Sequence, residues 1–150
     1  MNAQQYRAVI GWFNARPAAK KVLWAVSMGA VAAVYLLYLG LLAWLAWHAM
    51  WAQLGVTVVV PAAAFVVGTA LRAAIDRPRP YTKYGFVPLF PKNKTGQSMP
   101  SRHCFSAAAI AAAVWYVLPP LGAMLAGLAA VIAVSRVITG VHFVSDVLAG

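Results

Sequence analysis

No formally charged residue occurs between Val22 and Leu71, and this uncharged run constrains the fold more than any other feature of the chain. A helix needs about 20 apolar residues to cross a bilayer, so a run from residue 22 to residue 71 predicts two crossings. Apolar residues make up 63% of the 150-residue chain and charged residues only 9%, which soluble domains do not show. The sequence therefore predicts an all-α, polytopic bundle of transmembrane helices, in a single integral-membrane domain over residues 1–150.

Five spans are expected, separated by two kinds of break. Polar residues among tryptophans at residues 48–55 indicate a membrane interface between the first two spans. Pro119 and Pro120 favour a tight turn between the third and fourth spans. The expected spans are residues 22–47, 54–71, 104–118, 121–138 and a fifth that begins at Val144. Because the few residues from Val144 to Gly150 are too short to cross a bilayer, we expect the printed sequence to be a truncated form.

Residues 1–21 are expected to form a helix that lies in the membrane interface. Tyr6, Val9, Ile10 and Phe13 share one face of a helix, and polar and basic residues lie off that face. This amphipathic pattern is typical of helices that lie on a bilayer rather than cross it.

The balance of charges excludes several kinds of site. The chain has 12 Lys and Arg residues but only two acids, Asp76 and Asp146, for a formal net charge of +10. A site built on paired carboxylates, or a cluster of Asp and Glu that holds Mg²⁺ or Ca²⁺, would need more acids than the chain contains. The lone Cys104 excludes an internal disulfide and a thiolate zinc site. The basic residues lie at the ends of apolar runs, so no nucleic-acid partner is expected.

The polar segment of residues 72–103 is the expected active-site loop. It carries seven of the 12 basic residues, which a topology signal alone would explain, since Lys and Arg accumulate in cytoplasmic loops. Their arrangement is more particular. Arg72 closes the second span and Arg79 stands just before Pro80, so a helix end and a fixed turn can direct two guanidinium groups at one anion.

The segment ends in Pro100-Ser101-Arg102-His103, where the third span is expected to begin. The free N–H groups of a first helical turn form a site for phosphate, and proline is favoured there. Ser101 can add a hydroxyl group and His103 a titratable proton. Taken alone, Ser101 is more often a helix cap than a ligand.

The third group of polar residues consists of Arg136, His142 and Asp146. Ionisable residues in or beside a membrane span are costly and are functional by default. His142 and Asp146 are expected one helical turn apart on one face, where the carboxylate can orient the imidazole and leave its other nitrogen free to attack. The alternative is a structural His–Asp pair that joins two helices.

These three groups resemble the three signature motifs of the type 2 phosphatidic acid phosphatase superfamily, in order and in spacing. The matching segments are residues 72–80, 100–103 and 135–146, and the range that they span, Arg72 to Asp146, is about half of the chain. The superfamily also includes bacterial prenyl diphosphate phosphatases and vanadium-dependent haloperoxidases. Two positions differ from the commonest pattern, because Arg72 stands where Lys is usual and Arg102 where Gly is usual.

The resemblance implies a membrane phosphatase that acts on a lipid phosphate or diphosphate and needs neither a metal nor another cofactor. It implies that His142 attacks phosphorus and forms a phosphohistidine, that Asp146 orients His142, and that His103 protonates the leaving oxygen. The implied phosphate-binding residues are Arg72, Arg79, Ser101, Arg102 and Arg136. The implied substrates are prenyl phosphate or diphosphate, phosphatidic acid, or phosphatidylglycerol phosphate, presented in the bilayer.

The other polar residues of the loop have lesser expected roles. Asp76 and Arg77 fall between motif positions and are assigned none. Lys83, Lys92 and Lys94 are expected to meet anionic headgroups rather than take part in the chemistry.

With five spans, the amino terminus, the loop of residues 72–103 and the turn of residues 136–142 lie on one side of the membrane. Four basic residues near the amino terminus favour the cytoplasmic side, so we expect a cytoplasm-facing site in a bacterial cell membrane. Two alternatives stay open. One is a catalytically silent protein that binds lipid phosphates, and the other is a haloperoxidase-like enzyme that uses bound vanadate, which the apolar spans argue against.

Overall fold

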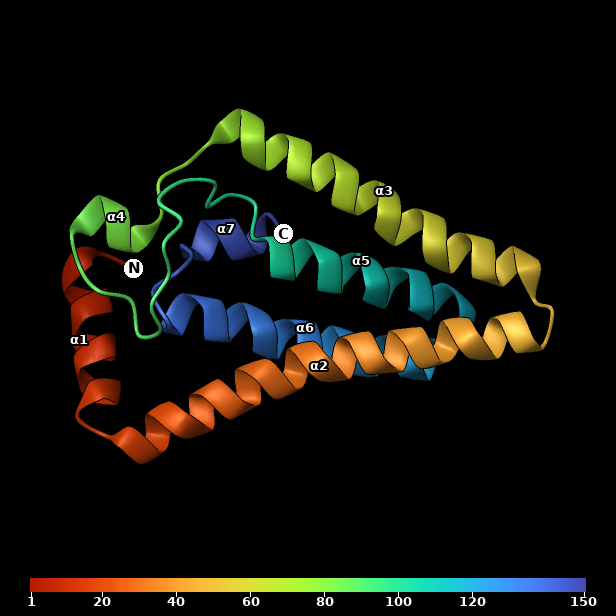
Figure 1. Cartoon of the computed structure of the whole chain (residues 1–150), viewed down its shortest axis with the longest axis horizontal. Helices are drawn as coiled ribbons and strands as arrows, with labels where there is room; N and C mark the ends of the chain where they lie inside the picture. The colour runs from red at the N-terminus through yellow and green to blue at the C-terminus, as the bar shows by residue number, and fades with distance from the viewer.

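The structure, a computed structural model, describes residues 1–150 and is entirely helical (Figure 1). The helices are α1 (Ala3–Asn14), α2 (Pro17–Trp47), α3 (Trp51–Ile75), α4 (Pro80–Tyr84), α5 (Arg102–Val117), α6 (Pro119–Ile138) and α7 (Val144–Leu148). The four long helices α2, α3, α5 and α6 run along the length of the molecule, and the short helices gather with α1 at one end (Figure 1). The predicted all-α bundle is confirmed.

Helices α2, α3 and α6 are long and apolar enough to cross a membrane. Their outward faces carry large apolar side chains, such as Leu36, Val59 and Val66, with exposed fractions of 70%, 63% and 66%. Such exposure is unfavourable in water and is expected where lipid covers the surface. The protein is therefore an integral membrane protein.

The expected third and fifth spans correspond to shorter helices. Helix α5 has 16 residues, which corresponds to about 24 Å of helix, less than the thickness of a hydrocarbon core. Helix α7 has five residues and ends close to Gly150. The predicted turn between the third and fourth spans is also shorter than expected. Only Leu118 separates α5 from α6, because Pro119 already occupies the first turn of α6, where its missing N–H is tolerated.

The connection between α2 and α3 is a tight turn of three residues, narrower than the predicted break of residues 48–55. Ala49 adopts a left-handed backbone conformation with a φ of 54°, which reverses the chain direction. Helix α3 then continues through Pro61 to Ile75, and Asp76, with a φ of 37°, ends it.

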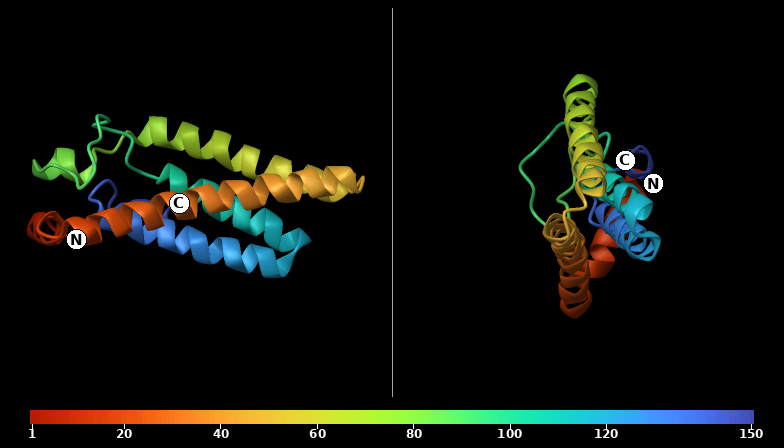
Figure 2. Two further views of the ribbon diagram at one scale, coloured as in Figure 1. Left: turned by 60° about the horizontal axis from the view of Figure 1, so that its bottom comes forward. Right: turned by 90° about the vertical axis from the view of Figure 1, so that its right-hand side faces the viewer.

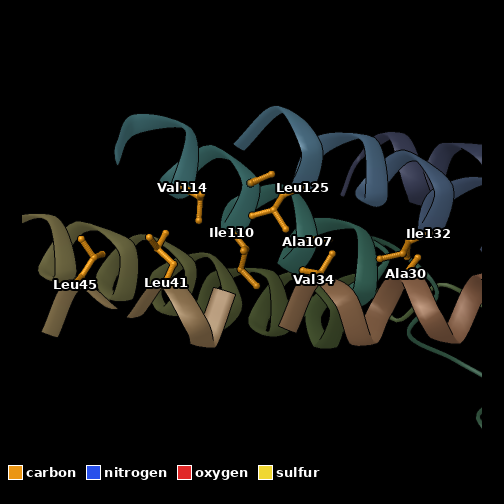
Figure 3. Packing of buried hydrophobic residues seen from close by; sticks show 10 residues of the cluster. Ala30, Val34, Leu41, Leu45, Ala107, Ile110, Val114, Leu125 and Ile132 are labelled. Atoms are coloured by element: carbon orange, nitrogen blue, oxygen red, sulfur yellow. The ribbon is translucent and has the colours of Figure 1, made fainter. Parts of the chain in front are cut away.

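The helices form two layers, α2 with α3 and α5 with α6 (Figure 2). The buried core lies where α2, α5 and α6 meet, and Figure 3 shows its side chains lying between these helices. Its members are apolar and several are small: Ala30, Val34, Leu41, Leu45, Ala107, Ile110, Ala111, Val114, Leu125 and Ile132. Small residues allow helices to approach closely, and the resulting van der Waals packing is one of the interactions that hold helices together within lipid.

The amino-terminal helix is shorter than predicted and is partly buried in protein. It ends at Asn14 rather than near residue 21, because α2 begins at Pro17 and contains Lys20 and Lys21. Tyr6 and Ile10, on the face expected to lie in the membrane interface, are 0% and 7% exposed. Part of that face therefore packs on the protein, at the end of the bundle where α4 and α7 lie (Figure 1).

Gly122 allows α6 to pack directly on α5. A Cβ atom at this position would lie 2.6 Å from the backbone nitrogen of Trp115, too close for any real contact. A backbone cannot yield as a flexible side chain can, so the two helices would have to separate. Gly127 lies on the same helix with no atom within 4 Å of the equivalent position.

We predict that Gly122→Ala lowers the thermal midpoint of the protein in detergent, since overpacking of this kind costs roughly 1–3 kcal/mol. Gly127→Ala is the matched control. It is expected to keep or slightly raise the midpoint, because alanine favours a helix over glycine by about 1 kcal/mol. Equal midpoints for the two variants would contradict the close packing of α5 on α6.

Candidate active site

The three motif segments meet at the end of the bundle that carries α1, α4 and α7 (Figure 1). Backbone hydrogen bonds hold the long loop across this end. The N–H of Arg79 donates to the carbonyl of Thr95 at 3.1 Å, and the N–H of Leu89 donates to the carbonyl of Thr139 at 3.1 Å. At the start of α5, the N–H of Ser101 donates to the carbonyl of Asp146 at 2.8 Å. The loop is thus tied to the residues after α3, to the end of α6 and to α7.

A cavity of about 170 Å³ opens where these segments meet. Its wall consists of Arg72, Arg79, Lys92, Lys94, Arg102, His103, Arg136, Val141 and His142. Six of these nine residues are cationic, two are histidines and none is an acid. The structure therefore brings four predicted arginines and both predicted histidines to one cavity. The positive charge of this cavity attracts anions.

Three of the four wall arginines, Arg72, Arg79 and Arg136, are buried, and several arginine donors have no partner. Arg72 donates to the carbonyl of Pro100, and Arg79 donates to the carbonyls of Gly96 at 3.2 Å and Val141 at 3.4 Å. The Nε of Arg72 and the Nε and Nη2 of Arg136 are buried without a hydrogen-bond partner. Unpaired buried donors are costly, and a bound oxyanion would satisfy them.

His142 and Asp146 are neighbours, but not in the way predicted. His142 lies before α7, so the pair does not share a helical face. Asp146 reaches back from the first turn of α7 and accepts the N–H of Phe143 at 2.8 Å, as an acidic residue at this position of a helix commonly does. The Nδ1 of His142 lies 3.6 Å from Oδ2 of Asp146, an electrostatic contact longer than a hydrogen bond.

Ser98 fills the gap between these two side chains. Its hydroxyl donates to Oδ2 of Asp146 and lies 3.5 Å from Nδ1 of His142. Nδ1 therefore faces Ser98 and Asp146, while His142 also lines the cavity, which leaves Nε2 as the nitrogen available to a ligand.

Burial determines the protonation of His142. It lowers the pKa of His142 below its ordinary value, an effect that Asp146 opposes and that Arg79 and Arg72 reinforce. Burial alone would raise the pKa of Asp146, but His142, Ser98, the N–H of Phe143 and Arg77 together hold it below the usual value. At neutral pH the imidazole is therefore uncharged and the carboxylate is ionised.

Two predicted site residues do not line the cavity. Ser101 is fully buried at the start of α5, and its side chain makes no capping hydrogen bond there. Asp146 is also fully buried, on the Nδ1 side of His142. The predicted His103 lies in the first turn of α5 and does line the cavity.

Lys92 and Lys94 line the cavity, so the anionic headgroups that they are expected to meet would be those of a lipid bound there. Lys83, by contrast, lies on α4 away from the cavity wall, with its Nζ 5.7 Å from the ring centre of Tyr84. Sequence spacing could not predict which of the three lysines would line the cavity, because the loop that carries Lys92 and Lys94 has no regular periodicity.

Tyr6, Ser98 and Arg77 contact the predicted pair but were not predicted. The hydroxyl of Tyr6 donates to the carbonyl of His142 at 3.0 Å, and burial beside Asp146 raises the pKa of Tyr6 to about 12, so the hydroxyl keeps its proton. Tyr6 lies 136 residues from its partner, and no pattern in the sequence indicates that contact. Ser98 and Arg77 lie close to motif residues, which was the only available signal.

The chain belongs to the PAP2 superfamily. The model of that family matches residues 53–150, about two thirds of the chain, and this range includes all three motif segments. No curated protein matches the chain.

Two solved structures share the fold. Over 98% of this chain and 86% of the other, the structure resembles LpxE from Aquifex aeolicus, with a TM-score of 0.71 and 23% sequence identity. It also resembles a transmembrane PAP2-type phosphatidylglycerolphosphate phosphatase from Bacillus subtilis, with a TM-score of 0.65 and 24% identity, over 99% of this chain and 79% of the other. The fold is thus that of membrane proteins of the PAP2 type.

Because donors of Arg136 are unpaired, replacing this residue is predicted to weaken anion binding without lowering the thermal stability of the protein. We expect Arg136→Met to weaken the binding of orthovanadate, a tetrahedral oxyanion like phosphate, about tenfold or more, as for the loss of a charged hydrogen bond. Its thermal midpoint is expected to stay level or to rise, because an unpaired buried charge is removed. Calorimetry and thermal melts in one detergent measure both quantities.

The control for Arg136→Met is Lys21→Gln, which removes one exposed charge from α2 outside the cavity. It is expected to leave both quantities unchanged. Vanadate affinity in Arg136→Met equal to that of the parent protein would show that Arg136 does not hold the anion.

Proposed function

We propose that this protein is a membrane phosphatase that hydrolyses a phosphate or diphosphate ester of a lipid through a phosphohistidine, without a metal ion. The observation that carries the proposal is the cavity, where six cationic side chains surround two imidazoles. Membership of the PAP2 superfamily and the fold shared with a phosphatidylglycerolphosphate phosphatase support it. Anchoring by membrane helices suits a substrate that stays in the bilayer.

In the first step, Nε2 of His142 attacks phosphorus while the bond to the lipid oxygen breaks. Burial keeps the imidazole neutral and therefore nucleophilic. Asp146 and Ser98 hold the Nδ1 side of the ring and stabilise the positive charge that the ring gains as the P–N bond forms. The product of this step is a phosphohistidine.

Positive charge around the phosphoryl group stabilises the transition state. Arg72, Arg79 and Arg136 hold the equatorial oxygens, and the unpaired donors of Arg72 and Arg136 give this role structural support. The amino terminus of α5 adds its free N–H groups, including that of Arg102. These groups compensate the charge that Mg²⁺ compensates in many other phosphoryl-transfer enzymes.

His103 is the proposed acid and base. Burial and the cations around it lower the pKa of His103 well below its ordinary value, so His103 takes up a proton only when the anionic substrate offsets those cations. It then gives this proton to the leaving lipid oxygen in the first step and takes one from the attacking water in the second. That water displaces His142 from phosphorus, which releases inorganic phosphate and restores both histidines.

The number of cations favours a substrate with a second anionic group. Three of the six cationic residues, Lys92, Lys94 and Arg102, remain once Arg72, Arg79 and Arg136 hold the transferred group. A diphosphate, or a monoester next to a phosphodiester, would use this additional charge. A single phosphate ester such as phosphatidic acid would not.

We also propose that the site faces the cytoplasm of a bacterial cell. Helix α1 and the start of α2 lie at the end of the bundle that carries the cavity (Figure 1). These segments contain Arg7, Arg16, Lys20 and Lys21. The turn between α2 and α3 and the turn between α5 and α6 contain no Lys or Arg. This asymmetry agrees with the excess of positive charge on the cytoplasmic side of membrane proteins.

Phosphate release in the presence of EDTA tests the proposal. The purified protein in detergent is given prenyl phosphate, prenyl diphosphate, phosphatidic acid and phosphatidylglycerol phosphate, in parallel with His142→Ala and with Lys21→Gln as the surface control. We expect metal-free release by the parent protein and the control, fastest on substrates with two phosphates. His142→Ala is expected to lose at least about a thousandfold in rate, as for removal of a nucleophile.

Each other outcome has a defined meaning. Release that survives in His142→Ala would refute the phosphohistidine. If the protein bound one of these lipids tightly but released phosphate from none of them, the catalytically silent lipid-phosphate-binding alternative would be favoured. Oxidation of bromide by added hydrogen peroxide, catalysed by the vanadate-loaded protein, would instead favour the haloperoxidase-like alternative.

A further inference from the structure

The carboxylate of Asp146 is held on both of its oxygens, and the two oxygens face different partners. Oδ2 accepts the hydroxyl of Ser98 and the N–H of Phe143, and it is the oxygen near His142. Oδ1 accepts Nη1 of Arg77 at 2.8 Å. Arg77 is therefore the cationic partner of the carboxylate, although it does not line the cavity.

Three further contacts hold Arg77 in this position. Its Nη1 donates to the hydroxyl of Ser145 at 2.8 Å and lies 3.5 Å from the sulfur of Met99. Its guanidinium carbon lies 4.4 Å from the ring centre of Phe143, within the range of a cation–π contact. The side chain is 31% exposed while that of Asp146 is 0% exposed, so Arg77 closes the solvent side of a buried charge.

We propose that Arg77 is a positioning residue that fixes the Asp146 carboxylate and offsets part of its charge, and that it thereby tunes the basicity of His142. This inference rests on the proposed function for its catalytic consequence. An ionised carboxylate beside an imidazole favours the protonated ring, which cannot attack phosphorus. A guanidinium paired with that carboxylate weakens this effect and keeps the imidazole neutral, while Asp146 still orients it.

Other charges also act on His142, and the test must hold them constant. Asp146 lies on its Nδ1 side, while Arg72 of α3 and Arg79 before α4 oppose protonation. His103 of α5 and Arg136 of α6 line the same cavity. Arg77 differs from these cations because it contacts Asp146 rather than the cavity, so its removal leaves the anion site intact.

Two substitutions separate charge from geometry. Arg77→Met removes the charge and keeps an apolar side chain against Phe143, whereas Arg77→Lys keeps the charge without the planar fork. The matched control is Lys83→Gln. Lys83, like Arg77, is a cation near Phe143, with its Nζ 5.9 Å from the ring centre, but it has no bond to Asp146. The control is expected to match the parent protein in every measurement.

The first measurement is the titration of His142 followed by NMR of ¹⁵N-labelled histidine in detergent, with signals assigned through His142→Ala and His103→Ala. In Arg77→Met the titration midpoint of His142 is expected to rise by about one pH unit, because no guanidinium then offsets the negative charge of Asp146. In Arg77→Lys it is expected to stay near the parent value. An unchanged midpoint in Arg77→Met overturns the proposal, whether or not the protein is an active phosphatase.

The second measurement is the pH dependence of phosphate release. For Arg77→Met we expect kcat to fall about ten- to a hundredfold, KM to stay constant, and the acid limb of kcat to move to higher pH. Arg77→Lys is expected to keep the parent limb and recover part of kcat. If both variants lost activity only in proportion to lost folded protein, with no shift of the limb, Arg77 would be merely structural.

Discussion

Repulsion among cations gathered at one end of an apolar bundle is the constraint on which the rest of this structure depends. Six cationic side chains line one small cavity, and no acid offsets them there. Six cations can stay this close together only if rigid structural elements hold them in place. Helices α3 and α6 supply Arg72 and Arg136, and carbonyls of the loop hold the guanidinium groups of Arg72 and Arg79. An entering oxyanion relieves the repulsion, so the unfavourable empty state contributes to the affinity for phosphate.

Neither of the two acids of the chain lines that cavity. Asp76 accepts the N–H of Gln97 at 3.1 Å and so helps to hold the loop. Asp146 lies on the Nδ1 side of His142, surrounded by its own donors, so the carboxylate orients the imidazole without entering the cavity. In the proposed mechanism, the site thus separates a cationic side that binds the anion from a polar side that controls His142, the proposed nucleophile. A nucleophile between these sides can remain neutral and still gain positive charge during the reaction.

Much of the fold followed from the sequence, because long uncharged runs and charges at their ends have few solutions in a membrane. Arg72, Arg79, Arg102, His103, Arg136 and His142 were expected at one site, and the structure brings them to one cavity. Lengths and local geometry were less predictable. Proline at the start of α6 shortened a turn, and the reach of Asp146 to Phe143 replaced the helical pairing expected with His142. Contacts such as that of Tyr6 with His142 depend on how α1 docks, which no local pattern encodes.

A structure of the protein with bound orthovanadate tests the central role of the cavity most directly, because vanadate adopts the trigonal bipyramid of a phosphoryl group in transfer. We expect vanadium bonded to Nε2 of His142, with its equatorial oxygens on Arg72, Arg79 and Arg136 and an apical oxygen toward His103. Vanadate bound elsewhere, or in the cavity but bonded to no atom of His142, would contradict the assignment of the nucleophile and of the arginines that surround it.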